Sequence, residues 1–470
     1  MSCTVLLPYG DNKIIIGTFD DGIYLYDYVT GEIKSNFVKA SVNEKFKKVF
    51  IYAAAKLGED LFAIGTTNQE GILIINKKGE LIQQINTENS HLEDNTAYAM
   101  FCDYTKSSEL WISTYGVLSK AYFNIPITIF SDKQGIESGV NEISMYMGSI
   151  YLSSDAGILK SYVDQNDNLK FRKIQGMNSQ AFPLKVINTP SESFILTGTL
   201  DGIFQIREGD AVRNVDNICI NKPQKQPYNV RKILQSERDP DILFFGLQTG
   251  EILILKYLSG RWYYLNKIRQ LSGVVYSMVE KKDGRGLWLI TDDPDALYRI
   301  DFNEQDSVLT KYGPEKGIGD IDLNTIGFID SEIYVTSSAG ILKYNKDTDS
   351  FIPGSLFPNS PSPVQSATNI YQDKDGDLWY SEFSNANHEY LIRKNGGTSE
   401  LYNGVLHILP DVPLMDILFA DGKTYFLKSK EIYVADKAGL VVDKSILNPS
   451  FVKITIGTDS SVTFRNLQFS

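Results

Sequence analysis

The chain has 470 residues, of which 42% are hydrophobic and 22% charged, which excludes a disordered chain and is enough for more than one folded core. Its net charge of −12, without a lysine and arginine cluster among aromatic residues, excludes nucleic acid as a partner. No run approaches the ~18 apolar residues of a membrane helix. The opening MSCTVLLPYG lacks a secretory signal. Either the chain is cytoplasmic or its native N-terminus is missing.

A repeated pattern runs along the chain: an apolar strand that ends in Gly/Ser–Thr, a short polar loop, and a second apolar strand. Its copies start at Ile14, Phe62, Leu110, Ile150, Ile195, Leu243, Leu287, Ile333, Leu378 and Tyr425. The residue in the threonine place, the marker, is number 18, 66, 114, 154, 199, 247, 291, 337, 382 or 429, so the intervals are 40 to 48 residues. A period of about 45 residues with about four short strands per unit is typical of β-propeller blades.

Acidic–glycine pairs precede two of the Leu-Trp strands. Asp283–Gly284 and Asp375–Gly376 provide the positive φ of a tight hairpin turn. We expect Trp111, Trp288 and Trp379 to fill the space between blades, because a small sheet cannot bury both of its apolar faces alone. The pattern therefore recurs once per blade.

The ten copies exceed the about four to eight blades of one ring. The shortest interval, between Thr114 and Ser154, marks a seam. We predict an all-β protein: a complete seven-bladed β-propeller in residues 126–450, preceded in residues 1–125 by about three blades of a second, truncated propeller whose opening blades are absent. The outer strand of the third blade would come from that absent part. The segment PITIFSD from Pro126 could instead close the second ring by pairing with its last blade.

The segments GDLWYSE, GRGLWLIT, ELWISTYG and IIIGTFDDGIYLYDYVTGEI resemble the two-component regulator propeller repeat, G-x-LW-I-G-T-x-x-G-G-L-x-x-Y-D-x-x-T-G. The final segment SVTFRNLQFS, within residues 451–470, resembles the opening strand of the immunoglobulin-like triple-tyrosine domain that follows such propellers. The resemblance implies the sensor portion of a bacterial hybrid two-component regulator. It also implies a periplasmic or extracellular location, with the membrane reached only through parts missing from this chain.

No catalytic constellation is visible, so we predict no enzyme activity, no cofactor and no metal. His91, His388 and His407 are far apart in the sequence, and none adjoins a nucleophile motif. The segment DKDGD from Asp373 is similar to a calcium loop, but its glycine is displaced and Ser384 stands at the twelfth position, so we interpret it as a hairpin turn.

Binding surfaces in propellers gather at one mouth of the central channel, where the loops between second and third strands converge. In the predicted ring these loops follow the marker, and they present carboxylates, amides and a hydroxyl that could hydrogen-bond a small polyhydroxylated molecule such as an oligosaccharide. The candidate ligand-binding residues are Asp155, Asp201, Gln248, Asp292, Asp293, Ser338 and Asn385. Each could also simply form a tight turn.

Three functions remain open. The first is an extracellular ligand-sensing domain, which the resemblance favours. The second is a protein-interaction scaffold that could form a homodimer through a ring face. The third is a propeller lyase, which would need a histidine or carboxylate cluster with a metal at the channel mouth. This ranking rests on analogy between folds.

Overall fold

The structure is a computed structural model that describes residues 2–67, 70–90, 92–103, 109–123, 127–165, 168–223, 227–269, 271–292, 297–303, 307–356, 367–383, 389–395, 398–401, 414–436, 454–456 and 460–462. It divides into two compact units, Ile127–Leu440 and Met1–Pro126 together with Val441–Ser470. Strands dominate both units, which confirms the all-β prediction. No helix in the described ranges has the length and apolarity needed to cross a membrane.

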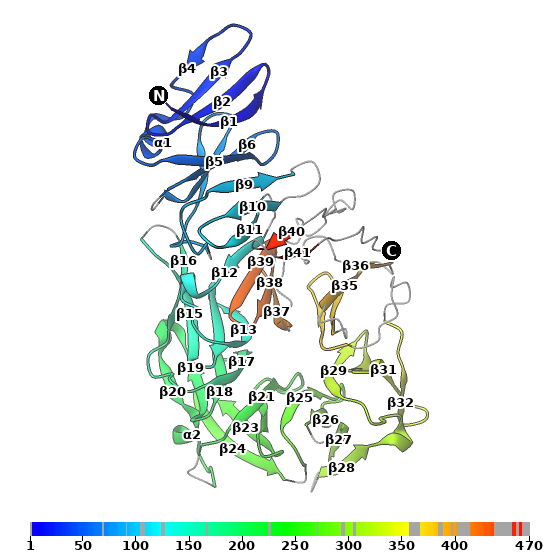
Figure 1. The fold of residues 1–470 in the computed structure, drawn as a ribbon. Helices are drawn as coiled ribbons and strands as arrows, with labels where there is room; N and C mark the ends of the chain where they lie inside the picture. Colours follow the sequence, from blue (N-terminus) through cyan, green and yellow to red (C-terminus); the bar gives the residue numbers. More distant parts are fainter. Residues whose placement is uncertain are drawn as a thin grey trace. The chain divides into compact units, whose positions relative to one another are not determined.

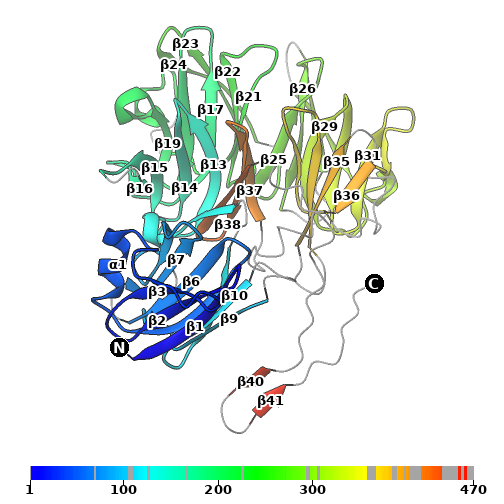
Figure 2. The same cartoon turned by 90° about the horizontal axis from the view of Figure 1, so that it is seen from above.

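Among its described residues, the first unit contains two four-stranded sheets, one sheet with three strands and one with two strands. Its strands are β1 (Cys3–Gly10), β2 (Lys13–Thr18), β3 (Ile23–Asp27), β4 (Ile33–Lys34), β5 (Ile51–Lys56), β6 (Leu61–Thr66), β7 (Ile72–Asn76), β8 (Leu81–Ile85), β9 (Ala99–Cys102), β10 (Glu109–Ser113), β11 (Leu118–Tyr122), β40 (Ile454–Ile456) and β41 (Ser460–Val462). The helix α1 (Ala40–Phe46), which the repeat did not predict, lies beside the first two sheets (Figure 2). Its Val42 and Phe46 are buried in their shared core.

The second unit contains seven four-stranded sheets among its described residues. Its strands are β12 (Ile127–Phe130), β13 (Val140–Tyr146), β14 (Ser149–Ser154), β15 (Gly157–Val163), β16 (Leu169–Lys173), β17 (Ala181–Asn188), β18 (Ser193–Thr199), β19 (Gly202–Ile206), β20 (Val212–Asn214), β21 (Val230–Gln235), β22 (Ile242–Leu247), β23 (Ile252–Leu258), β24 (Arg261–Ile268), β25 (Val275–Glu280), β26 (Gly286–Thr291), β27 (Leu297–Phe302), β28 (Ser307–Tyr312), β29 (Leu323–Ile329), β30 (Glu332–Ser337), β31 (Gly340–Asn345), β32 (Ser350–Pro353), β33 (Ile370–Gln372), β34 (Leu378–Phe383), β35 (Glu389–Asn395), β36 (Thr398–Leu401), β37 (Leu414–Ala420), β38 (Lys423–Lys428) and β39 (Glu431–Asp436). The helices are α2 (Val215–Ile218), η2 (Asp132–Gln134), η3 (Glu208–Asp210) and η4 (Pro314–Lys316).

Six of the sheets follow the chain, whereas the seventh combines distant segments. Its strand order is β12-β39-β38-β37, with Ile127–Phe130 antiparallel to residues 432–435. The segment after Pro126 therefore pairs with the last sheet of this unit. This is one of the two alternatives that the sequence analysis left open for this segment. First strands of successive sheets contact each other, from β37 through β13, β17, β21 and β25 to β29 (Figure 1). This is a propeller-type arrangement, and because the blades of a propeller surround a central channel, we take the first strands to line it.

The marker residues mark the ends of second strands in the structure. The hydroxyl of buried Ser154 donates to the carbonyl oxygen of Gly157 at 2.8 Å and accepts from the N–H of Ala156 at 3.2 Å. Thr18 and Ser337 make the same two kinds of bond with their own loops. A serine or threonine recurs here because its hydroxyl satisfies the tight loop between second and third strands.

The glycine before the marker allows close packing between sheets. A Cβ on Gly198 would lie 2.6 Å from the Cβ of Val230, and one on Gly246 would lie 2.6 Å from a methyl carbon of Val275. Val230 and Val275 begin the first strands of the next sheets. In the Gly-Thr pair of the repeat, the glycine therefore allows the next sheet to approach closely, and the threonine hydroxyl hydrogen-bonds the loop that follows.

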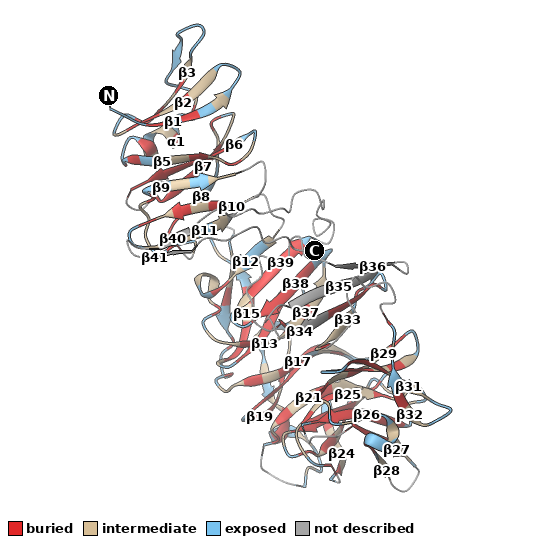
Figure 3. Ribbon diagram, turned by 45° about the vertical axis from the view of Figure 1, so that its right-hand side comes forward, coloured by how far each residue is buried: buried red, intermediate tan, exposed pale blue. Residues whose placement is uncertain are grey.

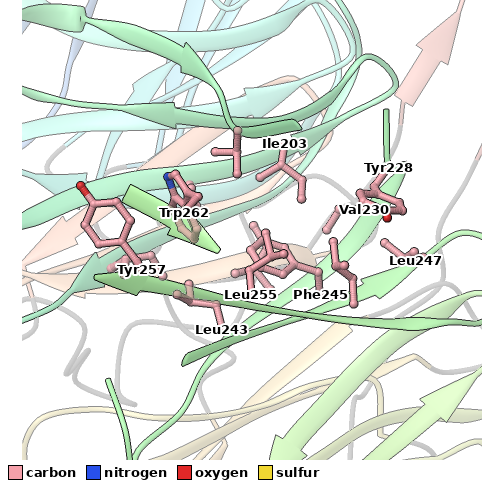
Figure 4. Close-up of a cluster of buried hydrophobic side chains, with 14 of the residues drawn as sticks. Ile203, Tyr228, Val230, Leu243, Phe245, Leu247, Leu255, Tyr257 and Trp262 are labelled. Carbon is pink, nitrogen blue, oxygen red and sulfur yellow. The ribbon is translucent and has the colours of Figure 1, made fainter. Parts of the chain in front are cut away.

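Apolar cores lie between neighbouring sheets, which confirms the physical basis of the repeat. One cluster joins β17–β20 to β21–β24 and contains Phe245, Tyr257 and Trp262 (Figure 4). Another joins β25–β28 to β29–β32 around Trp288. Figure 3 shows buried residues along β38 and β39, strands in the interior of their sheet. Trp379 is fully buried, and its ring centroid lies 5.8 Å from that of Phe419 in the next sheet.

A polar network ties β25–β28 to β29–β32 beside the core around Trp288. Asp349 Oδ1 accepts from Tyr312 Oη at 2.6 Å, Arg299 Nη1 at 2.7 Å and Tyr344 Oη at 2.8 Å, and its Oδ2 accepts from Lys316 Nζ at 2.5 Å. Burial works against the charge, but the donors, Lys316 first, hold the pKa of Asp349 well below its usual range. The carboxylate thus stays charged in the folded protein.

The predicted turns are present, since Gly284 and Gly376 have φ of 64° and 80°. The number of blades and the boundaries 1–125, 126–450 and 451–470 stay predictions. The triple-tyrosine domain also stays a prediction; within residues 451–470 the structure describes only β40 and β41, which pair antiparallel.

Candidate ligand-binding site

The loops after the second strands occupy equivalent positions at one end of their sheets. In each, the N–H of a loop residue donates to the carbonyl of a residue that precedes the first strand of the same sheet. The bonds are Asp155 to Gly139 (2.9 Å), Leu200 to Gln180 (3.2 Å), Gln248 to Asn229 (2.9 Å), Asp292 to Val274 (3.1 Å) and Ser338 to Asp322 (2.8 Å). The first strands line the channel, so these loops form one mouth of it.

Asp155 and Asp201 are exposed at this mouth. Asp155 Oδ1 accepts from Gln180 Nε2 at 2.8 Å, a contact that links its loop to the next sheet. Asp201 accepts a hydrogen bond from the hydroxyl of Ser179, just before the first strand of its own sheet. Each carboxylate therefore accepts one hydrogen bond from a neutral side chain and is also exposed to solvent.

The remaining described candidates lie on the next three sheets. Gln248 is half-buried and accepts from the guanidinium of Arg231. Asp292 is exposed, and its Oδ1 accepts from the N–H of Val274 at 2.5 Å. Ser338 is exposed, and its Oγ accepts from the N–H of Asp322 at 3.0 Å. Asp293 and Asn385 lie outside the described residues.

A second layer of charged residues, which the sequence analysis missed, lines the channel just below the mouth. Glu142, Lys232 and Asp416 stand at equivalent places on first strands, directly after a register shift near the start of β13, β21 and β37. Lys232 Nζ lies 3.4 Å from Glu142 Oε1, although the sheet that begins with β17 separates their strands. We call these three residues the inner layer.

The carboxylates of the inner layer connect one sheet to the next. Asp416 Oδ2 accepts from the N–H of Ile143 at 3.1 Å, and Glu142 Oε2 accepts from the N–H of Leu184 at 2.8 Å. A lysine side chain cannot accept a hydrogen bond, so Lys232 cannot make the same contact with a backbone N–H of the next sheet. Its ammonium group instead donates a hydrogen bond across the channel to Glu142.

Burial raises the pKa of Asp416 to about 7, and the negative charge of Glu142 adds to this effect. The Glu142 carboxylate in turn raises the pKa of Lys232. The Lys232 and Glu142 side chains nevertheless keep 36% and 28% of their surface accessible. The layer is thus enclosed by protein but reachable from solvent.

The sequence did contain a signal for the inner layer. Glu142 opens the segment EISMYM, in which a carboxylate stands at the start of an otherwise apolar strand. The same is true of Asp416 within LMDILFA. A charge at the start of an apolar first strand therefore indicates a channel-lining position.

The DKDGD segment forms the hairpin turn that we expected. Asp373 Oδ1 accepts from the N–H groups of Asp375 and Asp377, each at 3.0 Å, and its Oδ2 accepts from Trp379 Nε1 at 3.0 Å. Carboxylate oxygens of the three aspartates lie within 4.8 Å of one another. The role of Asp373 in the turn accounts for this grouping, and the absence of a metal here stays a prediction. The three histidines lie outside the described residues.

No protein-family model and no curated protein sequence matches the chain. Among solved structures, the extracellular domain of the proposed hybrid two-component system BT3049 from B. thetaiotaomicron aligns over 92% of this chain and 61% of its own length, with a TM-score of 0.59 and 14% identity. That of BT4673, from the same organism, aligns over 92% and 57%, with a TM-score of 0.50 and 15% identity. Virginiamycin B lyase from Staphylococcus aureus aligns over 66% of this chain and 98% of its own, with 13% identity and a TM-score of 0.44, too low to bear on function.

The chain thus has a propeller-type fold similar to that of two extracellular domains, and it spans about three fifths of their length. Identities of 14% and 15% establish the fold alone.

Proposed function

We propose that this chain is a non-catalytic, ligand-sensing propeller region of a bacterial signal-transduction regulator, located outside the membrane. Its ligand is a small, neutral, polyhydroxylated molecule such as an oligosaccharide, bound at the channel mouth. The output module and the membrane segment belong to other parts of such a regulator, and residues 451–470 begin its triple-tyrosine domain.

One observation carries the ligand proposal: polar side chains of successive sheets stand at equivalent places around one mouth. Asp155, Asp201, Asp292 and Ser338 are all exposed there. Convergent acceptors on a rigid scaffold can bind several hydroxyl groups of one ligand at once.

The charge distribution favours a neutral ligand over an anionic one. Three exposed carboxylates, those of Asp155, Asp201 and Asp292, lie at the mouth, and the inner layer below it pairs the Glu142 carboxylate with the Lys232 ammonium group. An acidic sugar would meet repulsion from most of these groups. Sugar hydroxyl groups can instead donate to carboxylate oxygens in charge-assisted hydrogen bonds.

The location and the signalling role are supported by the two extracellular domains with which the fold aligns and by the repeat that the sequence resembles. The coverage of 57% to 61% of those domains fits a chain that represents part of a larger sensor. We also propose that residues 1–125 are the last blades of a propeller that begins outside this chain.

A thermal-shift screen with neutral, uronic-acid and sulfated oligosaccharides tests the proposal, because a ligand that binds only the folded state raises the melting temperature. We expect a neutral glycan to give a shift. Asp155→Ala should weaken its binding by roughly ten- to one-hundredfold, the worth of a hydrogen bond to a charged group.

Asp347→Ala is the matched control, because Asp347 is exposed in the β31–β32 turn, outside the mouth. We expect it to leave binding unchanged. A shift from acidic glycans alone, or an equal effect of both variants, would contradict the proposal.

A further inference from the structure

A second hollow, away from the channel mouth, lies at the outer rim of the second unit. It has a volume of about 650 Å³ and lies between the fourth strands of two neighbouring sheets, β20 and β24, with α2 along one side. The mouth is formed by loops that follow second strands, so the two places share no residue. Its lining includes Arg213, Asn217, Ile218, Ile220, Arg261 and Trp262.

The wall formed by α2 and the residues after it is firmly held. Asp216 Oδ2 accepts from the N–H of Ile203 at 2.8 Å, and its Oδ1 accepts from Lys222 Nζ at 2.7 Å. The side chains of Asp216 and Lys222 are only 3% and 5% exposed. The N–H of Ile220 donates to the carbonyl of Trp262 at 2.9 Å. The groove is therefore preformed, which lowers the entropy cost of binding.

The groove combines two cationic groups with an apolar surface. Arg213 and Arg261 are exposed, and neither has an ion-pair partner in the part of the chain that the structure describes. Ile218 and Ile220 keep 43% and 36% of their surface exposed. Two exposed guanidinium groups thus line one groove with two exposed isoleucines, although the chain as a whole has a net charge of −12.

We propose that this groove binds an extended acidic peptide segment of a partner protein. Its carboxylates would pair with Arg213 and Arg261, since a guanidinium can donate two parallel hydrogen bonds to one carboxylate. An aliphatic side chain of the peptide would cover Ile218 and Ile220, and the amide of Asn217 could bond the peptide backbone.

An anionic glycan fits the groove less well. Among the described residues that line the groove, Trp262 is the one aromatic, and its side chain is fully buried among Phe194 and Tyr257 in the core below (Figure 4). The described lining thus opens no aromatic face to a sugar ring, whereas the exposed isoleucines suit an aliphatic side chain.

Fluorescence anisotropy of the full chain with a labelled synthetic peptide of alternating glutamate and leucine tests this proposal. We expect saturable binding that weakens as salt is raised. Arg213→Ala and Arg261→Ala should each weaken binding of this peptide by about tenfold. A peptide with glutamine in place of glutamate should bind the wild type at least about tenfold more weakly than the glutamate peptide does. Ile218→Ser should weaken binding without removing its salt dependence.

Arg285→Ala is the matched control, because Arg285 is exposed in the β25–β26 turn of the same unit. It should leave peptide affinity unchanged, and so should Asp155→Ala at the mouth. Unchanged melting temperatures will show that the variants are folded. Equal affinity of wild type and the Arg213→Ala/Arg261→Ala double variant, or binding of a sulfated oligosaccharide with no binding of the peptide, would overturn the inference.

Discussion

The hydroxyl of Ser154 offers a direct test of the role that we assign to the marker. Ser154 is fully buried, donates to Gly157 at 2.8 Å and accepts from Ala156 at 3.2 Å. Ser154→Ala removes both bonds and almost no volume. Each buried hydrogen bond is worth about 1 kcal/mol, so we expect a loss of about 2 kcal/mol in the free energy of unfolding.

Urea denaturation followed by tryptophan fluorescence measures this loss as a lower midpoint at an unchanged slope. Ser191→Ala is the matched control, because Ser191 is exposed in the β17–β18 turn. It should stay within about 0.5 kcal/mol of wild type. The reasoning is refuted if Ser154→Ala is as stable as Ser191→Ala.

Three further substitutions test other parts of the account. Gly198→Ala should cost about 2 to 3 kcal/mol, because the added Cβ would lie 2.6 Å from Val230; chemical denaturation measures this. Asp349→Ala should lower stability at neutral pH by about 2 kcal/mol, a value reduced for its partial exposure. The loss should shrink as pH falls below about 4, because the depressed pKa of Asp349 contributes stability only above the unfolded-state pKa. Asp416 should act in the opposite sense. Its carboxyl keeps its proton up to about pH 7 in the folded chain but ionises near pH 4 in the unfolded chain. Between these pH values the free energy of unfolding of the wild type should therefore fall by about 2 kcal/mol relative to that of Asp416→Asn.

Each substitution has a control in the same unit. Gly327→Ala places its Cβ in open space within β29 and should be neutral. Asp347→Ala and Asp436→Asn change exposed aspartates and should not alter stability or its pH dependence. A pH profile of Asp416→Asn that parallels that of wild type would show that the inner layer does not hold this proton.

The repeat in the sequence predicted the fold well because the same physical problem recurs in every sheet. The marker positions fall at the ends of second strands, or within one residue of them, in copies as different as those ending at Thr18 and Lys428. What the repeat could not predict is the content of the longer intervals. The helix α1 and the α2 segment occupy loops between sheets, where no periodicity constrains the chain.

The mouth residues were predictable only because their sequence position relative to the marker fixes their place in the fold. The inner layer was not predicted, because its residues lie on first strands, whose register depends on a local shift before Glu142 and Asp416. The contact between Lys232 and Glu142 crosses a whole sheet, so no local pattern could have shown it. Likewise, the rim groove depends on two arginines, Arg213 and Arg261, that are 48 residues apart in the sequence.

The most direct test of the central claim is a crystal structure of the chain with a neutral oligosaccharide from the thermal-shift screen. We predict electron density for the sugar over the mouth, with its hydroxyl groups donating to Asp155 and Asp292. Density confined to the rim, or to the opposite end of the channel, would contradict the claim that this mouth is the ligand-binding site.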